Sequence, residues 1–406
     1  MQVRSVIRFG SEENITTHRF YTVTGLKTPM PELTRLERSL GCLFGGAMGD
    51  AFGYPVELMP LERIRSNFGP EGLTEPLLSD GRYCISDDTQ MILLTADGFL
   101  TGYTRACTRG IAAPPVIYIY EKYRTWAKGM GYGLKGDTPT LGSWLMDDPA
   151  MTARRAPGRT CIENLTGYDR PGRPEEPRND SKGCGGLMRV APLGLAAHLF
   201  SDPAGKALEW GETAAASTHG HPLGWMTAAF LSSLIYHICE GTGLAASVDK
   251  AKGDCIARYQ DNSYLIQMTG LLDRAVDLAG SDLPDGECME ALGEGWVAEE
   301  TLAMAVFSCL RHAGDFKGCL RCAVNVTGDS DSIGSVAGNI LGAYLGIGAV
   351  EKAFDISRLE CGDKIRAISE DIISGCPSHE FGPADGIWDA KYIEGRDPYR
   401  SVLRCR

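Results

Sequence analysis

The stretch Gly328-Asp329-Ser330-Asp331-Ser332-Ile333-Gly334 leads directly into residues 335–348, which carry no charged side chain. A helix start exposes unpaired backbone N–H groups and the positive end of the helix dipole, so it stabilises carboxylates, and helix capping is one interpretation of these acids. A second stretch of the same kind, Ser86-Asp87-Asp88-Thr89-Gln90, precedes an apolar run that ends near residue 100. Carboxylates and hydroxyls from two helix starts would form the all-oxygen ligand set that a hard divalent cation prefers. The two stretches together therefore predict a metal site.

Glycine recurs at every fourth position in the two helices that these motifs predict. The two runs are Gly41, Gly45, Gly49, Gly53 and Gly334, Gly338, Gly342, Gly346. Each glycine inside a helix lowers its stability by about 1 kcal/mol relative to alanine. Positions four apart lie along one ridge of the helix, and a ridge without side chains lets another backbone approach closely. The second run is long enough to suggest a membrane span. Its glycine-rich composition and its two leading acids instead favour two closely packed core helices, so we expect no membrane span.

The composition of the whole chain bounds its class. A length of 406 residues, with 43% hydrophobic and 23% charged residues, is typical of a soluble globular protein with a large core. The net charge of -12 argues against nucleic-acid binding, which needs a basic face. The first residues lack the apolar core of a secretory signal, which predicts a cytoplasmic protein.

The 14 cysteines are scattered, except for Cys319-Leu320-Arg321-Cys322. A zinc ribbon needs a second such pair, so we interpret most of these thiols as small buried apolar groups in a reducing compartment.

The periodicity divides the chain into a short arm and one large helical domain. Residues 1–33 alternate like two strands around a turn, and we predict a β-like extension there. Residues 34–406 form the main domain in this interpretation, and strand signals are few in it. The predicted helices are 116–128, 141–151, 204–218, 223–239, 248–260, 266–278 and 297–310. The polar, Pro- and Gly-rich run 154–180 is typical of a surface loop that shapes a site. The expected fold class is all-α.

Two further segments carry weaker signals. In residues 181–189, the glycines before Arg189 can bring backbone N–H groups close to phosphate oxygens, but the segment matches neither the P-loop nor the dinucleotide fingerprint. In the turn Thr218-His219-Gly220-His221-Pro222, the two histidines would be a metal pair only with a third ligand nearby. Capping or ring stacking is the favoured interpretation of these histidines.

Five motifs taken in order resemble the ADP-ribosylglycohydrolase family, whose prototype reactivates dinitrogenase reductase. They are residues 41–53, 86–89, 185–194, 218–222 and 328–334. The resemblance covers the chain from about residue 36 to residue 350. It implies a compact, orthogonal multi-helix domain with two Mg²⁺ or Mn²⁺ ions at the base of a cleft.

Carried over position by position, the resemblance implies a set of site residues. The implied metal ligands are Ser86, Asp87, Asp88, Asp329, Asp331 and Ser332. Many members have Thr at the position of Ser86, and both residues supply a hydroxyl. The implied catalytic residues are Glu57, Asp87 and Asp331, and the implied substrate-binding residues are Gly185, Gly186, Met188, Arg189 and His219.

The resemblance also implies an activity, the removal of ADP-ribose from modified protein side chains. The stretch 154–161 looks like bacterial members that act on arginine, so we expect the N-glycosidic bond of ADP-ribosyl-arginine to be the target. Serine-linked (O-linked) ADP-ribose, ADP-ribose polymers and small ADP-ribosylated molecules remain open as substrates. A metal-dependent phosphohydrolase and a non-catalytic ADP-ribose-binding protein are the alternatives from other classes.

The arm at residues 1–33 resembles an extension of bacterial immunity hydrolases that protect against ADP-ribosyltransferase toxins. We expect this arm to bind such a toxin by strand addition or by occupying its cleft. A non-catalytic protein that sequesters the toxin is the alternative for this role. The sequence therefore predicts two protein partners, a modified substrate and a toxin.

Overall fold

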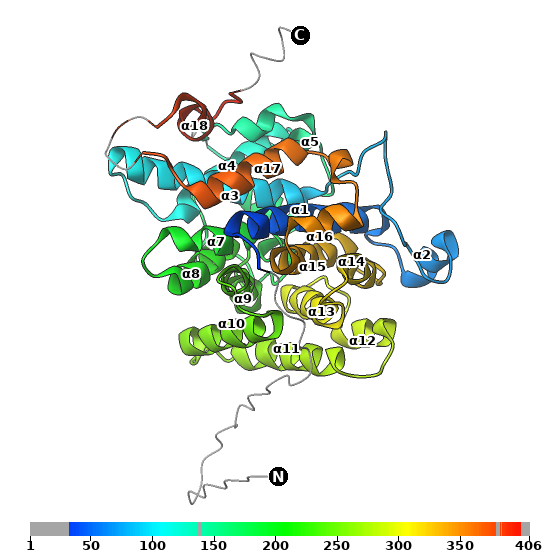
Figure 1. Cartoon of the computed structure of the whole chain (residues 1–406). Coiled ribbons are helices and arrows are strands. Elements are labelled where there is room, and N and C mark those ends of the chain that lie inside the picture. Colours follow the sequence, from blue (N-terminus) through cyan, green and yellow to red (C-terminus); the bar gives the residue numbers. More distant parts are fainter. Residues whose placement is uncertain (1–31, 137–139, 379–381, 383, 399–406) are drawn as a thin grey trace, which may run out of the picture.

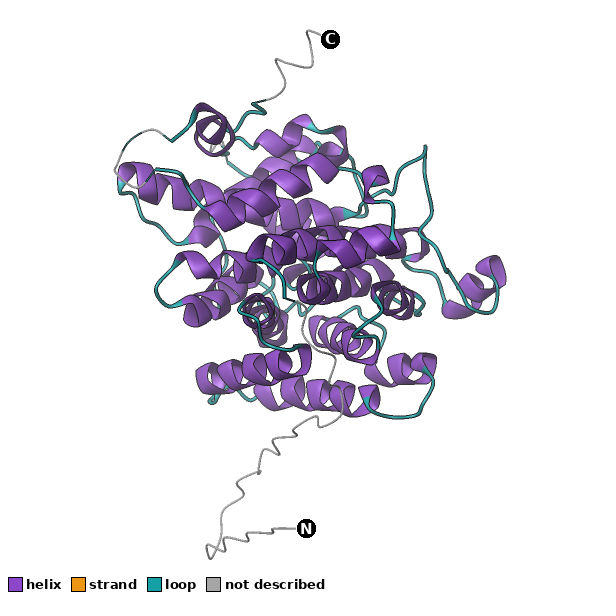
Figure 2. Cartoon of the chain, in the orientation of Figure 1, coloured by secondary structure: helices purple, strands orange, loops and turns teal. Residues whose placement is uncertain are grey.

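The computed structural model describes residues 32–136, 140–378, 382 and 384–398, and every regular element among them is a helix (Figure 1, Figure 2). Strand-like pairing in these ranges is limited to isolated bridges, such as that of Tyr83 with Leu359. The prediction of an all-α fold is confirmed. Residues 1–31 of the predicted β-like extension lie outside the described residues.

Two glycine-rich helices, α1 (Arg35–Gly53) and α15 (Ser330–Leu345), cross at the centre of the molecule (Figure 1). A Cβ atom added at Gly45 would lie 2.4 Å from the carbonyl oxygen of Gly338, and one added at Gly338 would lie 2.0 Å from that of Gly45. Real Cβ atoms do not approach other atoms so closely. Only glycine permits this crossing, so the predicted packing of two glycine ridges is confirmed.

The two helices run antiparallel, and this direction places their functional ends together. Gly53 at the end of α1 packs against Ser330 at the start of α15, where an added Cβ would lie 2.4 Å from the Ser330 carbonyl oxygen. The far end of α1 is fixed by a capping box, in which the Thr34 hydroxyl accepts from the backbone N–H of Glu37 at 3.1 Å. The contact of Gly53 with Ser330 therefore places the start of α15 beside the end of α1.

Further helices pack on both sides of this central pair (Figure 1). The first side is built by α3 (Asp87–Arg109), α4 (Pro115–Gly129), α7 (Ala191–Ala196) and α17 (Gly362–Ser374). The second side is built by α9 (Pro222–Cys239), α13 (Ala298–Arg311) and α14 (Phe316–Val324), with α10 (Leu244–Tyr259), α11 (Leu265–Ala279) and α12 (Asp285–Leu292) outside them.

The remaining elements are short or peripheral. They are η1 (Tyr54–Val56), α2 (Leu61–Phe68), η2 (Trp144–Asp147), α5 (Pro149–Thr152), α6 (Arg159–Gly167), η3 (Cys184–Gly186), η4 (Ala197–Leu199), α8 (Pro203–Ala216), α16 (Ile347–Ala353), η5 (Ile356–Arg358), α18 (Gly386–Asp389) and the π-helical turn η6 (Ala390–Glu394).

Six of the seven predicted helices match α4, α8, α9, α10, α11 and α13, with ends that differ by four residues at most. The seventh, over 141–151, is wrong as a single helix, because the structure has η2 followed by α5. Pro149 disfavours helical backbone at the residue before it, and Asp148 at that position is extended. Its carboxylate accepts from the Ala150 N–H at 2.9 Å and so starts a new helix.

The second glycine run also bears on the question of a membrane span. Within the described residues, no single helix is long and apolar enough to cross a membrane. The pair α15 and α16 passes this test only jointly, and its two helices are bent by 120°.

Candidate metal centre and substrate cleft

The start of α3 is fixed by a buried acid from α1. The Asp50 carboxylate accepts from the backbone N–H of Ser86 at 3.0 Å and from that of Thr89 at 3.1 Å, and it also accepts from the Thr89 hydroxyl. Ser86 caps the helix, because its hydroxyl accepts from the Asp88 N–H at 3.2 Å. These bonds satisfy the free N–H groups of the helix start and hold Asp88 in one orientation.

Asp87 is fixed from the opposite side by the irregular loop after α5. The backbone N–H of Gly158 donates to Asp87 Oδ2 at 3.1 Å, and the Asp87 N–H donates to the Arg155 carbonyl oxygen at 3.1 Å. The Arg155 guanidinium is itself paired with Glu360 at 3.0 Å. The start of the run 154–180 therefore contacts the first acidic motif directly, but the prediction of one irregular loop over the whole run is wrong, because its proline-free part forms α6 (Arg159–Gly167).

The start of α15 brings the second acidic motif to the same place. Asp329 caps α15 by accepting from the Ser332 N–H at 3.3 Å. The Ser332 hydroxyl donates to Asp88 Oδ1 at 3.3 Å, which joins two motifs 244 residues apart in the chain. Gly328 precedes this turn with φ 135°, and a Cβ there would lie 1.9 Å from the Glu294 carbonyl oxygen, so the turn requires glycine.

A cavity of about 170 Å³ lies between the two helix starts. Its lining includes Glu57 and five of the six predicted metal ligands, namely Asp87, Asp88, Asp329, Asp331 and Ser332. Ser86, the sixth, lies outside this lining and caps α3 instead. Gly185, Met188 and His219 from the predicted substrate set also line the cavity, together with Ala156 and Gly158 of the loop and Arg159 and Thr160 at the start of α6.

Negative charge accumulates in this cavity, because Arg159 of its lining is paired with Glu163 rather than with the clustered carboxylates. Burial, and then the neighbouring carboxylates, raise the pKa values of Asp88 and Asp331 well above the ordinary range. Burial likewise raises the pKa of Asp87, and burial with the charges of Asp329 and Asp50 raises that of Glu57 to about 7. Among the described residues, no lysine, arginine or histidine forms an ion pair with these carboxylates.

The donor set fits a hard divalent cation. The Asp88 Oδ2 atom is buried and has no hydrogen-bond partner among the described residues, although the other oxygen of that carboxylate does. A buried carboxylate oxygen without a partner is costly unless a cation or a proton satisfies it. The lining of carboxylate and hydroxyl oxygens suits Mg²⁺ or Mn²⁺ better than a softer ion.

The raised pKa values predict that the metal-free protein becomes less stable as pH rises. The folded pKa values of Asp87, Asp88 and Asp331 lie above the unfolded value of about 3.9, so the folded state holds more protons in the window between them. Thermal unfolding in EDTA should therefore give a lower Tm at ~pH 8 than at ~pH 5, and Mg²⁺ should raise the Tm more at the higher pH.

An Asp88→Asn variant is the control for this pH dependence. Because the amide cannot ionise, the Tm difference between the two pH values should be smaller than in the unmodified chain. An equal difference in both proteins would exclude Asp88 as a contributor.

Two histidines near the cavity have different surroundings. His219 is buried, and burial with the nearby Arg189 lowers its pKa to about 3, so its ring is neutral. Its Nδ1 lies 2.9 Å from the Thr218 hydroxyl. His221 starts α9 by accepting from the Leu223 N–H at 3.1 Å, and it packs edge-on against Tyr264. The favoured interpretation of His221, capping and ring stacking, is confirmed.

Gly186 and Arg189 lie behind the cavity rather than in its lining. The Arg189 guanidinium is fully buried, donates to the Ala214 carbonyl oxygen at 2.8 Å and to the Thr218 hydroxyl at 2.7 Å, and lies 4.6 Å from the centre of the Tyr123 ring. This position holds the glycine segment against the turn that carries His219.

The sequence interpretation does not include two residues of this site. Asp50 positions the first motif, and its place at the end of a glycine helix is the only local signal of that role. The Cys184 thiol donates to Asp329 Oδ2 at 2.7 Å and lines the cavity. Its position inside the glycine segment gives no indication of that contact, because the contact joins residues 145 apart.

Comparisons with known proteins bear on this site. The ADP-ribosyl-[dinitrogen reductase] glycohydrolase of Rhodospirillum rubrum is 24% identical to this chain over 330 residues, which cover 80% of this chain and 90% of that protein. The ADP-ribosylarginine hydrolase Tri1 of Serratia proteamaculans (strain 568) is 20% identical over 365 residues, which cover 88% of this chain and 85% of that protein.

A solved structure titled ADP-ribosylglycohydrolase-related protein complex superposes with a TM-score of 0.55 and 25% identity, covering 84% of this chain and 98% of that one. The sequence model of the ADP-ribosylglycohydrolase family matches residues 31–380, which is well over half of the chain. The chain therefore belongs to the ADP-ribosylglycohydrolase family, which indicates a hydrolase that acts on a glycosidic bond of ADP-ribose.

Proposed function

We propose that this chain hydrolyses the N-glycosidic bond between ADP-ribose and arginine side chains of modified proteins, with two Mg²⁺ or Mn²⁺ ions bound in the cavity. The observation that carries the proposal is the meeting of two acidic helix starts, joined by the Ser332–Asp88 hydrogen bond, around one cavity. The arginine linkage is supported by the name of the Tri1 relative and by the likeness of the stretch 154–161 to bacterial members that act on arginine.

The size of the cavity favours binding of one end of the substrate. A volume of about 170 Å³ is smaller than the ~300–1,000 Å³ of pockets that enclose drug-sized ligands. The terminal ribose would enter between the carboxylates, and the rest of ADP-ribose would lie over the glycine segment, where Gly183 and Gly185 line the opening. Small residues there let the diphosphate approach the backbone N–H groups.

Cleavage at the anomeric carbon passes through an oxocarbenium-like state, so proton transfer to the departing guanidine is needed. Glu57 lines the cavity, and burial raises the pKa of its carboxyl group in the metal-free chain, which suits a group that exchanges a proton with the substrate. Asp87 is oriented by the Gly158 N–H, and neutral His219 offers a hydrogen bond without charge. When bound, divalent cations supply orientation of the ribose hydroxyls and a lowered pKa of water.

The direct test is incubation with arginine- and serine-ADP-ribosylated proteins, with Mg²⁺ or with EDTA, while free ADP-ribose is measured. The expected result is release from the arginine-linked substrate with Mg²⁺ only. Release from the serine-linked substrate alone would replace the linkage in the proposal. Binding of ADP-ribose without any release would favour the non-catalytic alternative.

The immunity role stays a prediction on residues 1–33, of which 1–31 lie outside the described residues.

A further inference from the structure

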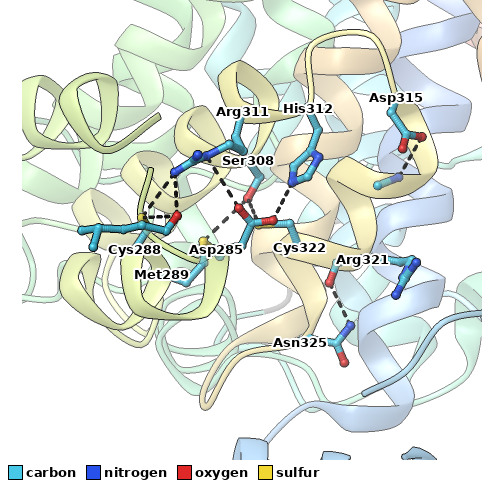
Figure 3. A network of polar contacts seen from close by, with 12 residues as sticks. Asp285, Cys288, Met289, Ser308, Arg311, His312, Asp315, Arg321, Cys322 and Asn325 are labelled. Carbon is cyan, nitrogen blue, oxygen red and sulfur yellow. Dashed lines mark hydrogen bonds and ion pairs between the residues drawn. The ribbon is translucent and has the colours of Figure 1, made fainter. Parts of the chain in front are cut away.

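A second group of metal-binding side chain types lies where α12, α13 and α14 meet (Figure 3). Asp285 begins α12, His312 follows the last residue of α13, and Cys322 lies within α14. One ligand atom from each of these side chains lies within 4.8 Å of the other two. All three line a cavity of about 340 Å³, and among the described residues this cavity shares no lining residue with the acidic cleft.

Neighbouring groups orient the three side chains toward one another. His312 Nε2 lies 2.7 Å from Asp285 Oδ2, and Arg311 Nε lies 3.6 Å from the other oxygen of the same carboxylate. The Ser308 hydroxyl contacts Cys322 Sγ at 3.5 Å. The Arg311 guanidinium is held in place by the Ser281 carbonyl oxygen at 2.6 Å, so it fixes Asp285 with one oxygen turned to His312 (Figure 3).

The structure also separates the two cysteines that the sequence brings close together. Cys319 is fully buried, and its sulfur lies 3.9 Å from that of Cys309 in the core. Cys322 is only partly buried and lines the cavity with Asp285 and His312. The Cys-x-x-Cys stretch therefore does not act as one pair, and Cys322 is placed with a histidine and an aspartate instead.

We propose that Asp285, His312 and Cys322 bind one Zn²⁺ ion, with a water molecule from the cavity as the fourth ligand. Nitrogen, sulfur and oxygen donors together are typical of tetrahedral zinc and are unsuited to Mg²⁺, which requires oxygen ligands. Binding replaces the thiol proton of Cys322, which passes to solvent, and neutral His312 binds through a ring nitrogen that carries no proton. Arg311 and Ser308 remain as the groups that orient the ligands.

Such an ion would tie three helices together next to the catalytic region. α14 ends at Val324, and the chain then runs through Gly328 into the second acidic motif. An ion that binds the folded state but not the unfolded chain raises the free energy of unfolding. We therefore expect Zn²⁺ to raise the Tm of the full chain, independently of Mg²⁺ at the acidic cleft.

The test uses the full-length protein, first stripped with EDTA and then freed of the chelator. Titration with Co²⁺ in place of Zn²⁺ should give a thiolate-to-cobalt absorption band that saturates at one equivalent of Co²⁺. Added Zn²⁺ should then remove the band by displacing the Co²⁺. Cys322→Ser should abolish the band and weaken Zn²⁺ binding by at least ~100-fold. Cys107→Ser, a partly buried thiol on α3, is the matched control and should keep both.

Two further variants keep the outcome decisive. His312→Gln preserves the thiol but removes a ligand, so it should also weaken Zn²⁺ binding, and it serves if Cys322→Ser fails to fold. Cys184→Ser tests the acidic cleft, where the other candidate thiol lies. A band lost in Cys184→Ser but retained in Cys322→Ser would overturn the proposal, as would the absence of both a cobalt band and a Zn²⁺-dependent rise in Tm.

Discussion

Asp331→Asn is expected to lower the release of ADP-ribose by on the order of 10³-fold or more, while the chain keeps its fold. Asp331 lines the cavity and is only 3% exposed. Its Oδ1 accepts from the Ser332 N–H at 3.0 Å, and the amide oxygen of asparagine can preserve that bond. The change therefore removes the negative charge that a bound cation needs and leaves the shape of the helix start.

The same variant should be at least as stable as the unmodified chain in EDTA. Burial and the neighbouring carboxylates raise the pKa of Asp331, so its charged form is unfavourable without a cation, and a neutral amide removes that cost. Circular dichroism and Tm in EDTA check the fold, and single-turnover release of ADP-ribose with Mg²⁺ checks the chemistry.

Asp363→Asn is a matched control for Asp331→Asn, because this acid lies in the first turn of α17 with 74% of its side chain exposed. It should leave release unchanged. Turnover of Asp331→Asn close to that of this control would contradict the assignment of Asp331 to the metal centre.

The sequence predicts the parts of this site that depend on local signals. A serine followed by two aspartates indicates the start of α3, and the same kind of stretch indicates the start of α15, because capping acts within one turn. The spacing of glycines by four predicts a flat face on each helix. Its recurrence in two helices predicts that they pack together, but it does not predict their antiparallel direction, which depends on the whole chain.

The groups that hold these motifs in place depend on long-range contacts. Arg189 follows a glycine segment and so suggests an anion contact, yet its guanidinium is enclosed by Tyr123 and Thr218 from distant segments. The place of Asp50 at the end of a glycine helix does not identify Thr89 as its partner, and no local pattern marks the contact of Cys184 with Asp329. Such contacts arise only when the helices pack, and the local sequence carries no record of them.

Gly338→Ala is the second change with a large expected effect, a loss of about 3 kcal/mol or more of the free energy of unfolding. The new methyl group would lie 2.0 Å from the carbonyl oxygen of Gly45, and that atom belongs to a helix backbone rather than to a flexible side chain. The two helices must separate to admit it. Separation would also weaken the 3.3 Å contact between Ser332 and Asp88, so Mg²⁺ should stabilise the variant less than the unmodified chain.

Gly253→Ala makes the same chemical change with the opposite expected sign. Gly253 lies inside α10 and is exposed, and a Cβ there would meet nothing within 4 Å. Alanine is favoured over glycine in a helix interior by about 1 kcal/mol, so this variant should gain stability. The free energy of unfolding of both variants, measured in urea with EDTA present, separates the effect of alanine's helix propensity from the effect of close helix packing. If both gained stability alike, the close crossing of α1 and α15 would be wrong, and the glycine ridges would not be what sets the distance between the two acidic motifs.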